Sequence, residues 1–270
     1  MNEYSDFAAI RCERPREGLL LAIMNRPAQL NAMDPAMLDD FDKLFGRLEE
    51  DEQVRIVILT GEGRGFCSGA DLTAAAQFKD SKAFAEPESF LRLVQERYAA
   101  LPLGLRRIPQ PVIAAVNGPA AGGGFALALA ADIRIASPEA YFVASFINIG
   151  LSAGELGVSY LLPRLVGLSR AAEILYTGRK VSAEEAEKIG LASRVVPRKK
   201  LLDEAMGLAG TMLGKNVGGL RLTKRVLDRN LGASSLEAAV ELENRNQTML
   251  VFSGDFFRLI QAFAKRDEKS

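Results

Sequence analysis

The chain has 270 residues, of which 48% are apolar, so it can bury one large core. Lys and Arg together number 34, as do Asp and Glu, and this balance supports neither a nucleic-acid surface nor a polybasic membrane anchor. Histidine is absent, which excludes Ser-His-Asp and Cys-His hydrolases and every metal site with histidine ligands. Two cysteines form no disulfide framework, and with no signal-peptide pattern they predict a cytoplasmic protein with free thiols.

Short apolar runs alternate with a helical pattern in the first part of the chain. Residues 7–12 and 18–24 are two such runs, and they predict a pair of antiparallel strands. Asp34 is a good N-cap for a helix that continues to about residue 49, and residues 54–59 predict the next strand. Alternation of this kind is typical of an α/β fold.

The stretch around which the rest of the chain is organised contains three consecutive glycines, Gly122–Gly124. Residues 112–116 predict a buried strand, Asn117-Gly118-Pro119 a turn, and residues 125–131 a buried helix. A strand, a glycine loop and a helix N-terminus in this order leave backbone N–H groups unpaired beside the positive end of a helix dipole. Such a loop suits a negatively charged oxygen. Alternatively, the glycines only let the helix pack tightly on the strand.

The second half of the chain is dominated by helical patterns. We expect a core over residues 1–197 and a helical region over residues 198–270. The C-terminal helices carry more large apolar side chains than a solvated tail would, and an exposed apolar surface of this size usually marks an interface. The sequence therefore predicts a subunit interface formed by the apolar residues Leu236, Val240, Met249, Leu250, Phe252, Phe256, Phe257 and Phe263.

Several segments in order match one known pattern, and the chain resembles the crotonase superfamily, the enoyl-CoA hydratase/isomerase family. The matching pieces are Asn25–Pro27, Asn31–Met33, Val57–Gly61, Phe66–Leu72, Ile113–Ile135, Gly150-Leu151, Leu162–Arg164, Thr177–Arg179 and Val195–Pro197. The resemblance implies a spiral of β-β-α units with a C-terminal helical region used in trimer contacts, and therefore a homotrimer or a hexamer formed as a dimer of trimers. It also implies an acyl-coenzyme A thioester as the ligand. Coenzyme A enters as part of that substrate, and no cofactor or metal is implied.

The resemblance also assigns residues to the two ends of the ligand. The backbone N–H groups of Ala70 and Gly123 correspond to those that bind the thioester oxygen as it becomes an enolate. Preorganised donors of this kind are worth roughly 3–4 kcal/mol each. Further residues match positions that bind the substrate and its coenzyme A: Ala28, Ser68, Asp71, Leu72 and Gly122.

The chain departs from the pattern of the family's hydratases at two positions. Those enzymes hold and activate water with two glutamates, and here the corresponding positions are Ala126 and Phe146. Neither side chain can take or give a proton, so these two residues are expected to line the pocket without acting on water. This departure argues against water addition by the two-glutamate mechanism.

One acid remains at a matching position, Glu155. It corresponds to the place where dienoyl-CoA isomerases carry an aspartate. Facing an apolar wall that includes Phe146, it would have its pKa raised toward the range of a general base. Alternatively, Glu155 is a solvated loop residue or a helix N-terminal acid. Two other polar groups are interpreted as structural: Asp132 at a strand start, and Cys67 as a small buried side chain.

Three functions stay open at this point. The first is an enzyme that shifts the double bond of an enoyl-CoA, with Glu155 as the proton shuttle. The second is a hydratase or hydrolase in which Glu155 activates water, and the third is an acyl-CoA-binding protein that has lost its catalytic acids. The acyl group cannot be read from the sequence, because residues 73–100, which form part of the pocket, carry little recognisable chemistry. Within them the pattern predicts a loop and then a helix from Glu88.

Overall fold

The computed structural model describes residues 4–73 and 80–267, with side chains as far as residue 261. It divides into two compact units, Met1–Gly210 and Thr211–Ser270. The division lies within a helix, later in the chain than the boundary at residue 197 that the helical pattern suggested. Each unit is described separately below.

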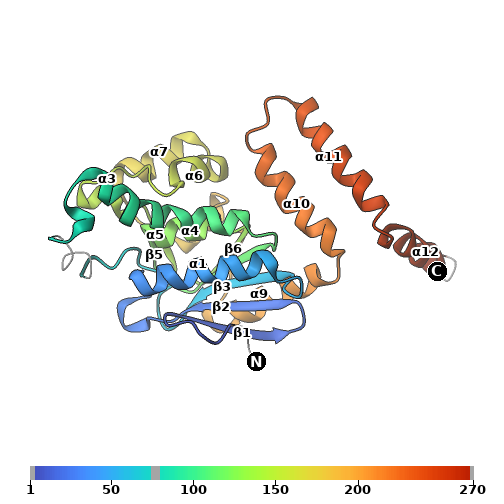
Figure 1. The fold of residues 1–270 in the computed structure, drawn as a ribbon, viewed down its shortest axis with the longest axis horizontal. Helices are drawn as coiled ribbons and strands as arrows, with labels where there is room; N and C mark the ends of the chain where they lie inside the picture. Colours follow the sequence, from blue (N-terminus) through green and yellow to red (C-terminus); the bar gives the residue numbers. More distant parts are fainter. Residues whose placement is uncertain (1–3, 74–79, 268–270) are drawn as a thin grey trace. The chain divides into compact units, whose positions relative to one another are not determined.

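The first unit is built on two sheets (Figure 1). Within the described residues, the larger sheet has six strands in the order β1 (Ile10–Arg16), β2 (Leu19–Met24), β3 (Ile56–Gly61), β4 (Val112–Val116), β6 (Ile133–Ala136) and β9 (Arg194–Val195). The smaller sheet has the order β5 (Ala120–Ala121), β7 (Tyr141–Val143) and β8 (Val181–Ser182).

The middle strands of the larger sheet are apolar and buried, whereas its edge strands β1 and β9 carry exposed charged residues. Every residue of β2, β3 and β4 is buried, as expected for strands in the middle of a largely parallel sheet. The predicted antiparallel pair is confirmed, with Ile10 of β1 opposite Met24 of β2. β2 pairs with β3, β3 with β4, and β4 with β6, all in parallel.

Parallel pairing brings the carboxyl ends of β2, β3 and β4 to one edge of the sheet. The loops that follow these strands are tied together there by the buried side chain of Asn117. Its Nδ2 donates to the backbone oxygens of Gly61 at 2.8 Å and Gly65 at 3.1 Å. Asn31 Nδ2 donates to the same Gly65 oxygen at 2.9 Å. These bonds fix the loops against one another at the edge where parallel sheets bind ligands.

Three helices pack on one another in the first unit, namely α1 (Pro35–Glu50), α4 (Glu96–Arg107) and α5 (Gly123–Ala130). Figure 1 shows α1 and α4 running alongside each other on one face of the sheet. The predicted cap of α1 is confirmed, because Asp34 Oδ1 accepts from the Met37 N–H at 2.9 Å. Every residue of α5 is buried, which confirms the predicted buried helix after the glycines.

The remaining helical elements of the first unit connect these layers. They are η1 (Pro27–Gln29), η2 (Lys82–Phe84), α3 (Pro87–Phe90), the π-helical turn η3 (Leu91–Gln95), η4 (Ser145–Ile149), α6 (Val158–Val166), α7 (Leu168–Thr177), α8 (Ala183–Lys188) and η5 (Arg198–Lys200). α9 (Leu201–Leu213) runs into the second unit. The helix expected from Glu88 begins one residue earlier, at Pro87, and it is interrupted by the π turn.

The second unit is helical and holds α10 (Val217–Asn230), α11 (Leu236–Val251) and α12 (Asp255–Asp267). No residue of α11 is buried within the chain, and Phe252 at its end is 82% exposed. The apolar residues that predict assembly therefore remain largely uncovered in the single chain; the side chain of Phe263 lies outside the described part. Among the described helices, none combines the length and apolar character needed to cross a membrane.

Candidate active site

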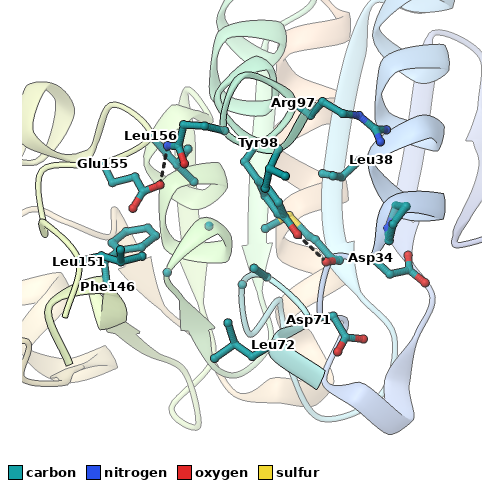
Figure 2. A pocket seen from close by; sticks show the side chains of 18 of the residues that line it. Asp34, Leu38, Asp71, Leu72, Arg97, Tyr98, Phe146, Leu151, Glu155 and Leu156 are labelled. Atoms are coloured by element: carbon teal, nitrogen blue, oxygen red, sulfur yellow. Dashed lines mark hydrogen bonds between the residues drawn. The ribbon is translucent and has the colours of Figure 1, made fainter. Parts of the chain in front are cut away.

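A cavity of about 510 Å³ opens in the first unit (Figure 2). Its wall is assembled from the start of α1, the loop 68–72, the segment 81–98, the glycine loop, η4 and the loop before α6. Most of the lining side chains are apolar, among them Leu38, Phe84, Phe90, Leu93, Phe146, Ile149 and Leu156. A concave, mainly apolar site with a few polar groups suits a small-molecule ligand that carries a hydrocarbon part.

Two backbone segments lie side by side at the wall of this cavity. Cys67 pairs with Ala120 as in a parallel ladder, and the Ala121 N–H donates to the Cys67 oxygen at 2.9 Å. Further along, a Cβ atom built on Gly69 would lie 3.3 Å from the Gly123 nitrogen. The backbone of Ala70 therefore lies beside that of Gly123, and both residues line the cavity.

The N–H groups of Ala70 and Gly123 are the donors that the sequence predicted. Neither has a hydrogen-bond acceptor among the described residues. Gly123 is the first residue of α5, so its N–H lacks an intrahelical partner and lies at the positive end of the helix dipole. This arrangement can accept a ligand oxygen on which negative charge develops.

The three glycines of the loop have different roles. At Gly122 the backbone has φ +51° and ψ −120°, a combination that only glycine adopts without strain. A Cβ atom on Gly124 would lie 2.1 Å from the Cys67 oxygen, which is too close for any side chain. Gly124 therefore serves tight packing, whereas Gly122 and Gly123 border the cavity. The packing interpretation therefore holds for Gly124, whereas anion binding at Gly122 and Gly123 stays a prediction.

Glu155 lies in the loop before α6 and lines the cavity. Its half-buried carboxylate accepts a hydrogen bond at 2.6 Å from Nε2 of Gln95, the last residue of η3. Figure 2 shows the Glu155 side chain near Phe146 and Leu151, two further lining residues. The next residue, Leu156, has φ +50°, an uncommon conformation for a branched side chain and one that clusters at functional sites.

The other predicted site residues fall into two groups. Ser68, Asp71 and Leu72 line the cavity with Gly122 and Phe146. Ala126 and Ala28 are not among the lining residues: Ala126 is fully buried inside α5, and Ala28 is exposed in η1. Asp71 forms an ion pair within the protein, because Arg26 Nη2 donates a hydrogen bond to its Oδ2 at 3.0 Å.

Asp132 and Cys67, which the sequence analysis interpreted as structural, both contact the protein's own backbone or neighbouring side chains. Asp132 Oδ2 accepts from the Val112 N–H at 2.8 Å, and its Oδ1 lies 3.6 Å from Arg106 Nη1, which confirms that interpretation. Cys67 is fully buried, as predicted, and burial raises the pKa of its thiol to about 12. A neutral thiol of this kind is not a nucleophile.

The polar lining residues that the sequence analysis missed include Gln95, Arg97 and Tyr98. Tyr98 donates from its hydroxyl to the Met33 oxygen at 3.1 Å, and burial raises its pKa to about 12. The helical spacing between Phe90 and Tyr98 is a signal that could have placed these two side chains on one face of a helix. The same spacing could not have placed Gln95.

Comparison with known proteins identifies the family of the chain. The sequence model of the family described as Enoyl-CoA hydratase/isomerase matches residues 14–269. A probable enoyl-CoA hydratase of Mycobacterium tuberculosis (strain H37Rv) is 46% identical over 263 residues, which cover 97% of this chain and 92% of that protein. The 1,2-epoxyphenylacetyl-CoA isomerase of Escherichia coli is 35% identical, covering 93% of this chain and 94% of that protein.

Solved structures share the fold. A probable enoyl-CoA hydratase/isomerase from Mycobacterium abscessus has a TM-score of 0.87 at 42% identity, covering 97% of this chain and 96% of that one. A monofunctional enoyl-CoA isomerase from M. smegmatis has a TM-score of 0.73 at 45% identity, covering 86% of this chain and 98% of that one. The fold is thus a crotonase fold. The chain belongs to the enoyl-CoA hydratase/isomerase family, whose members act on acyl-CoA substrates.

Proposed function

We propose that this protein moves the double bond of an enoyl-CoA, with Glu155 as the proton shuttle. The observation that carries the proposal is the contrast between Glu155 and the other ionisable groups in the described lining. Asp34 and Asp71 both lie against Arg26, at 3.3 Å and 3.0 Å. Glu155 forms no ion pair with any described residue, and its partner is a neutral amide. A carboxylate without a counterion is free to accept a proton from a substrate.

The proposed reaction needs one base and one oxyanion site. The thioester oxygen binds at the N–H groups of Ala70 and Gly123. Glu155 removes a proton from one carbon beside the double bond, and the electron pair of that C–H bond spreads through the acyl group onto the thioester oxygen. The same carboxyl then returns the proton to the carbon at the other end of the conjugated system. No atom is gained or lost, so a single carboxylate suffices.

Water addition makes a greater demand on the site. It usually needs separate acid and base groups, whereas the hydratase positions of this chain hold Ala126 and Phe146. Relatives named as probable hydratases favour a second candidate, in which Glu155 activates water. The solved structure of a monofunctional enoyl-CoA isomerase from M. smegmatis favours the first. A silent acyl-CoA-binding protein is the third outcome of the test below.

The coenzyme A end of the ligand is proposed to lie beside Ser68, Asp71 and Leu72 at the cavity mouth, with Ala28 near the adenine. No further cofactor is needed for the proposed reaction. The apolar side chains exposed on α11 and α12 support assembly into a homotrimer or a dimer of trimers.

The experiment is a screen of 2-enoyl and 3-enoyl thioesters of several chain lengths, read by mass spectrometry and by the ultraviolet absorbance of the conjugated thioester. Isomerisation leaves the mass unchanged and, run in deuterium oxide, introduces deuterium into the acyl chain. A mass gain of one water would establish the hydratase candidate instead. Tight binding of several thioesters with no turnover of any would establish the binding protein.

A further inference from the structure

The helical segment that forms one wall of the cavity contains one π turn. α3, η3 and α4 follow one another without a break, and the Glu96 N–H donates to the Leu91 oxygen, five residues earlier. Such single wide turns inside α-helices frequently occur at functional sites. The π turn covers Leu91–Gln95 and ends on Gln95.

This turn decides where Gln95 lies. In a regular α-helix with 3.6 residues per turn, positions five apart are separated by roughly 140° around the axis. In a π turn the same two positions lie close to one face, because the hydrogen bond joins residues five apart. Phe90 and Gln95 are five apart, and both line the cavity. Regular helical winding would turn Gln95 away from the cavity that Phe90 faces.

The hydrogen bond between Gln95 and Glu155 has a defined donor and a defined acceptor. Gln95 Nε2 lies 2.6 Å from Glu155 Oε1, a short distance for an amide donor. A carboxylate accepts only, so the amide nitrogen and not the amide oxygen must face it. This bond uses the carboxylate oxygen Oε1. The other oxygen, Oε2, accepts no hydrogen bond from the described residues.

No other charged group in the described lining competes for this carboxylate. From α1, Asp34 is paired with Arg26, and from the loop 68–72 Asp71 is paired with the same arginine. From α4, Arg97 pairs with Asp39, and the Tyr98 hydroxyl donates to the Met33 oxygen. The elements η4 and the glycine loop contribute no ionisable lining side chain.

We infer that Gln95 is a positioning residue that orients the Glu155 carboxylate toward the ligand. The inference deepens the proposed function and rests on it for the catalytic consequence. Donation to the charged form of an acid favours that form, so removal of the Gln95 donor is expected to make the Glu155 carboxylate easier to protonate. The bond also holds the flexible Glu155 side chain in one place beside η3.

Three substitutions at Gln95 test this with predicted signs. Gln95→Met keeps the length but removes the donor, so the midpoint of Glu155 titration rises by about one pH unit. Gln95→Glu places a second carboxyl beside the first, so the midpoint rises further. Gln95→Lys places a cation there, so the midpoint falls by about one unit. Leu91→Met is the matched control, because Leu91 lies on the same π turn but is exposed and outside the cavity lining.

Two measurements follow the effect of these substitutions. The carboxyl carbon of Glu155 is followed by ¹³C NMR in glutamate-labelled protein, with its signal assigned by loss in Glu155→Gln, and the pH profile of kcat/KM is measured on the thioester that the screen finds. Supporting results are shifts in the order Lys, wild type, Met, Glu in both measurements, with kcat falling about tenfold in Gln95→Met and KM little changed. The Leu91→Met midpoint should match wild type.

The possible contrary results separate the role of Gln95 from the proposed role of Glu155. Equal carboxyl midpoints in wild type, Gln95→Met and Gln95→Glu would overturn the role of Gln95, whatever the activity. Shifted carboxyl midpoints with an unshifted rate profile would overturn its catalytic consequence. If Glu155→Gln retained full turnover, the proposed shuttle would fall, whereas the NMR series would still report whether Gln95 controls the carboxyl.

Discussion

The guanidinium of Arg134 lies against the backbone oxygen of Ala131, directly after α5. Its Nη1 donates to that oxygen at 2.6 Å and to the Ala128 oxygen at 3.2 Å. Its Nε donates to the Leu191 oxygen at 2.7 Å. Burial lowers the pKa of Arg134 to about 10, so the side chain stays charged at neutral pH. A positive charge at the C-terminus of α5 stabilises the helix whose N-terminus carries the Gly123 donor.

Replacing this arginine is therefore expected to destabilise the fold. Arg134→Met leaves several buried carbonyls without donors, which costs about 2–4 kcal/mol of unfolding free energy. The melting temperature should fall by roughly 5–15 °C, measured by circular dichroism or calorimetry. Arg194→Met, on the exposed neighbouring strand β9, is the control and should change it little. A melting temperature unchanged in Arg134→Met would show that the helix end does not depend on this side chain.

The glycine loop gives the second prediction. A Cβ atom on Gly123 would lie 2.3 Å from Met33 Cε, so Gly123→Val must displace Met33 and crowd the space beside the donor. We expect turnover to fall about a hundredfold or more, the loss typical of one such donor. Steady-state kinetics on the screened thioester checks this, with Gly46→Ala as control because nothing lies within 4 Å of its new atom. Wild-type rates in a folded Gly123→Val protein would remove Gly123 from the site.

The two thiols give a prediction about pH. Burial raises the pKa of Cys67 to about 12 and, with a smaller contribution from Asp40, that of Cys12 to about 12. Near pH 8 the thiolate fraction is then about a thousandfold below that of an exposed cysteine, whose pKa is about 8.5. A thiol reagent should react slowly with the folded protein and rapidly once denaturant is added. Rapid reaction of either thiol in the native protein would contradict the buried position.

The same raised pKa values fix a sign for stability. Because the folded pKa lies above the unfolded one, the unfolded chain releases the thiol protons first. The free energy of unfolding should therefore be unaffected by these groups below about pH 8 and should fall as the pH rises from there toward 12. Urea denaturation at a series of alkaline pH values measures it, and stability that rises over this range would exclude the assignment.

Assembly gives the fourth prediction. Light scattering at micromolar concentration should report three or six times the chain mass of 29.2 kDa. Phe252→Glu should lower that mass, since Phe252 is 82% exposed in the single chain and a charge there would be buried on assembly. Gln247→Glu adds the same charge at an exposed position of α11 without removing apolar surface, and should leave the mass as it is. A monomeric wild type would contradict the prediction.

The parts of the fold that could be predicted are those with a long local signal. The helix predicted from the Asp34 cap to about residue 49 is α1, because its apolar residues recur with a 3.6-residue period over several turns and the cap marks its start. β5, β8 and β9 have two residues each and were not predicted. A strand of two residues has no period, and its pairing is decided by partners far away in the chain.

The candidate site divides in the same way. The loop with Gly123 could be placed because consecutive glycines between a strand and a helix predict a loop with unpaired backbone N–H groups, whereas Ala70 was assigned only by the resemblance to the family. Gln95 could not be found, because its direction depends on one π turn that no residue pattern announces. Ala126 was expected in the pocket wall, yet only the depth of α5 decides that its short side chain stays beneath the surface.

The claim that Glu155 moves the proton is tested most directly by the turnover of Glu155→Gln on the thioester that the wild type isomerises. Glutamine keeps the size of the side chain but cannot accept a proton, so turnover should fall about a hundredfold or more while acyl-CoA binding and assembly are retained. Glu62→Gln is the control, since Glu62 lies in another loop, pairs with Arg11 and does not line the cavity. Full turnover in Glu155→Gln would show that another group moves the proton.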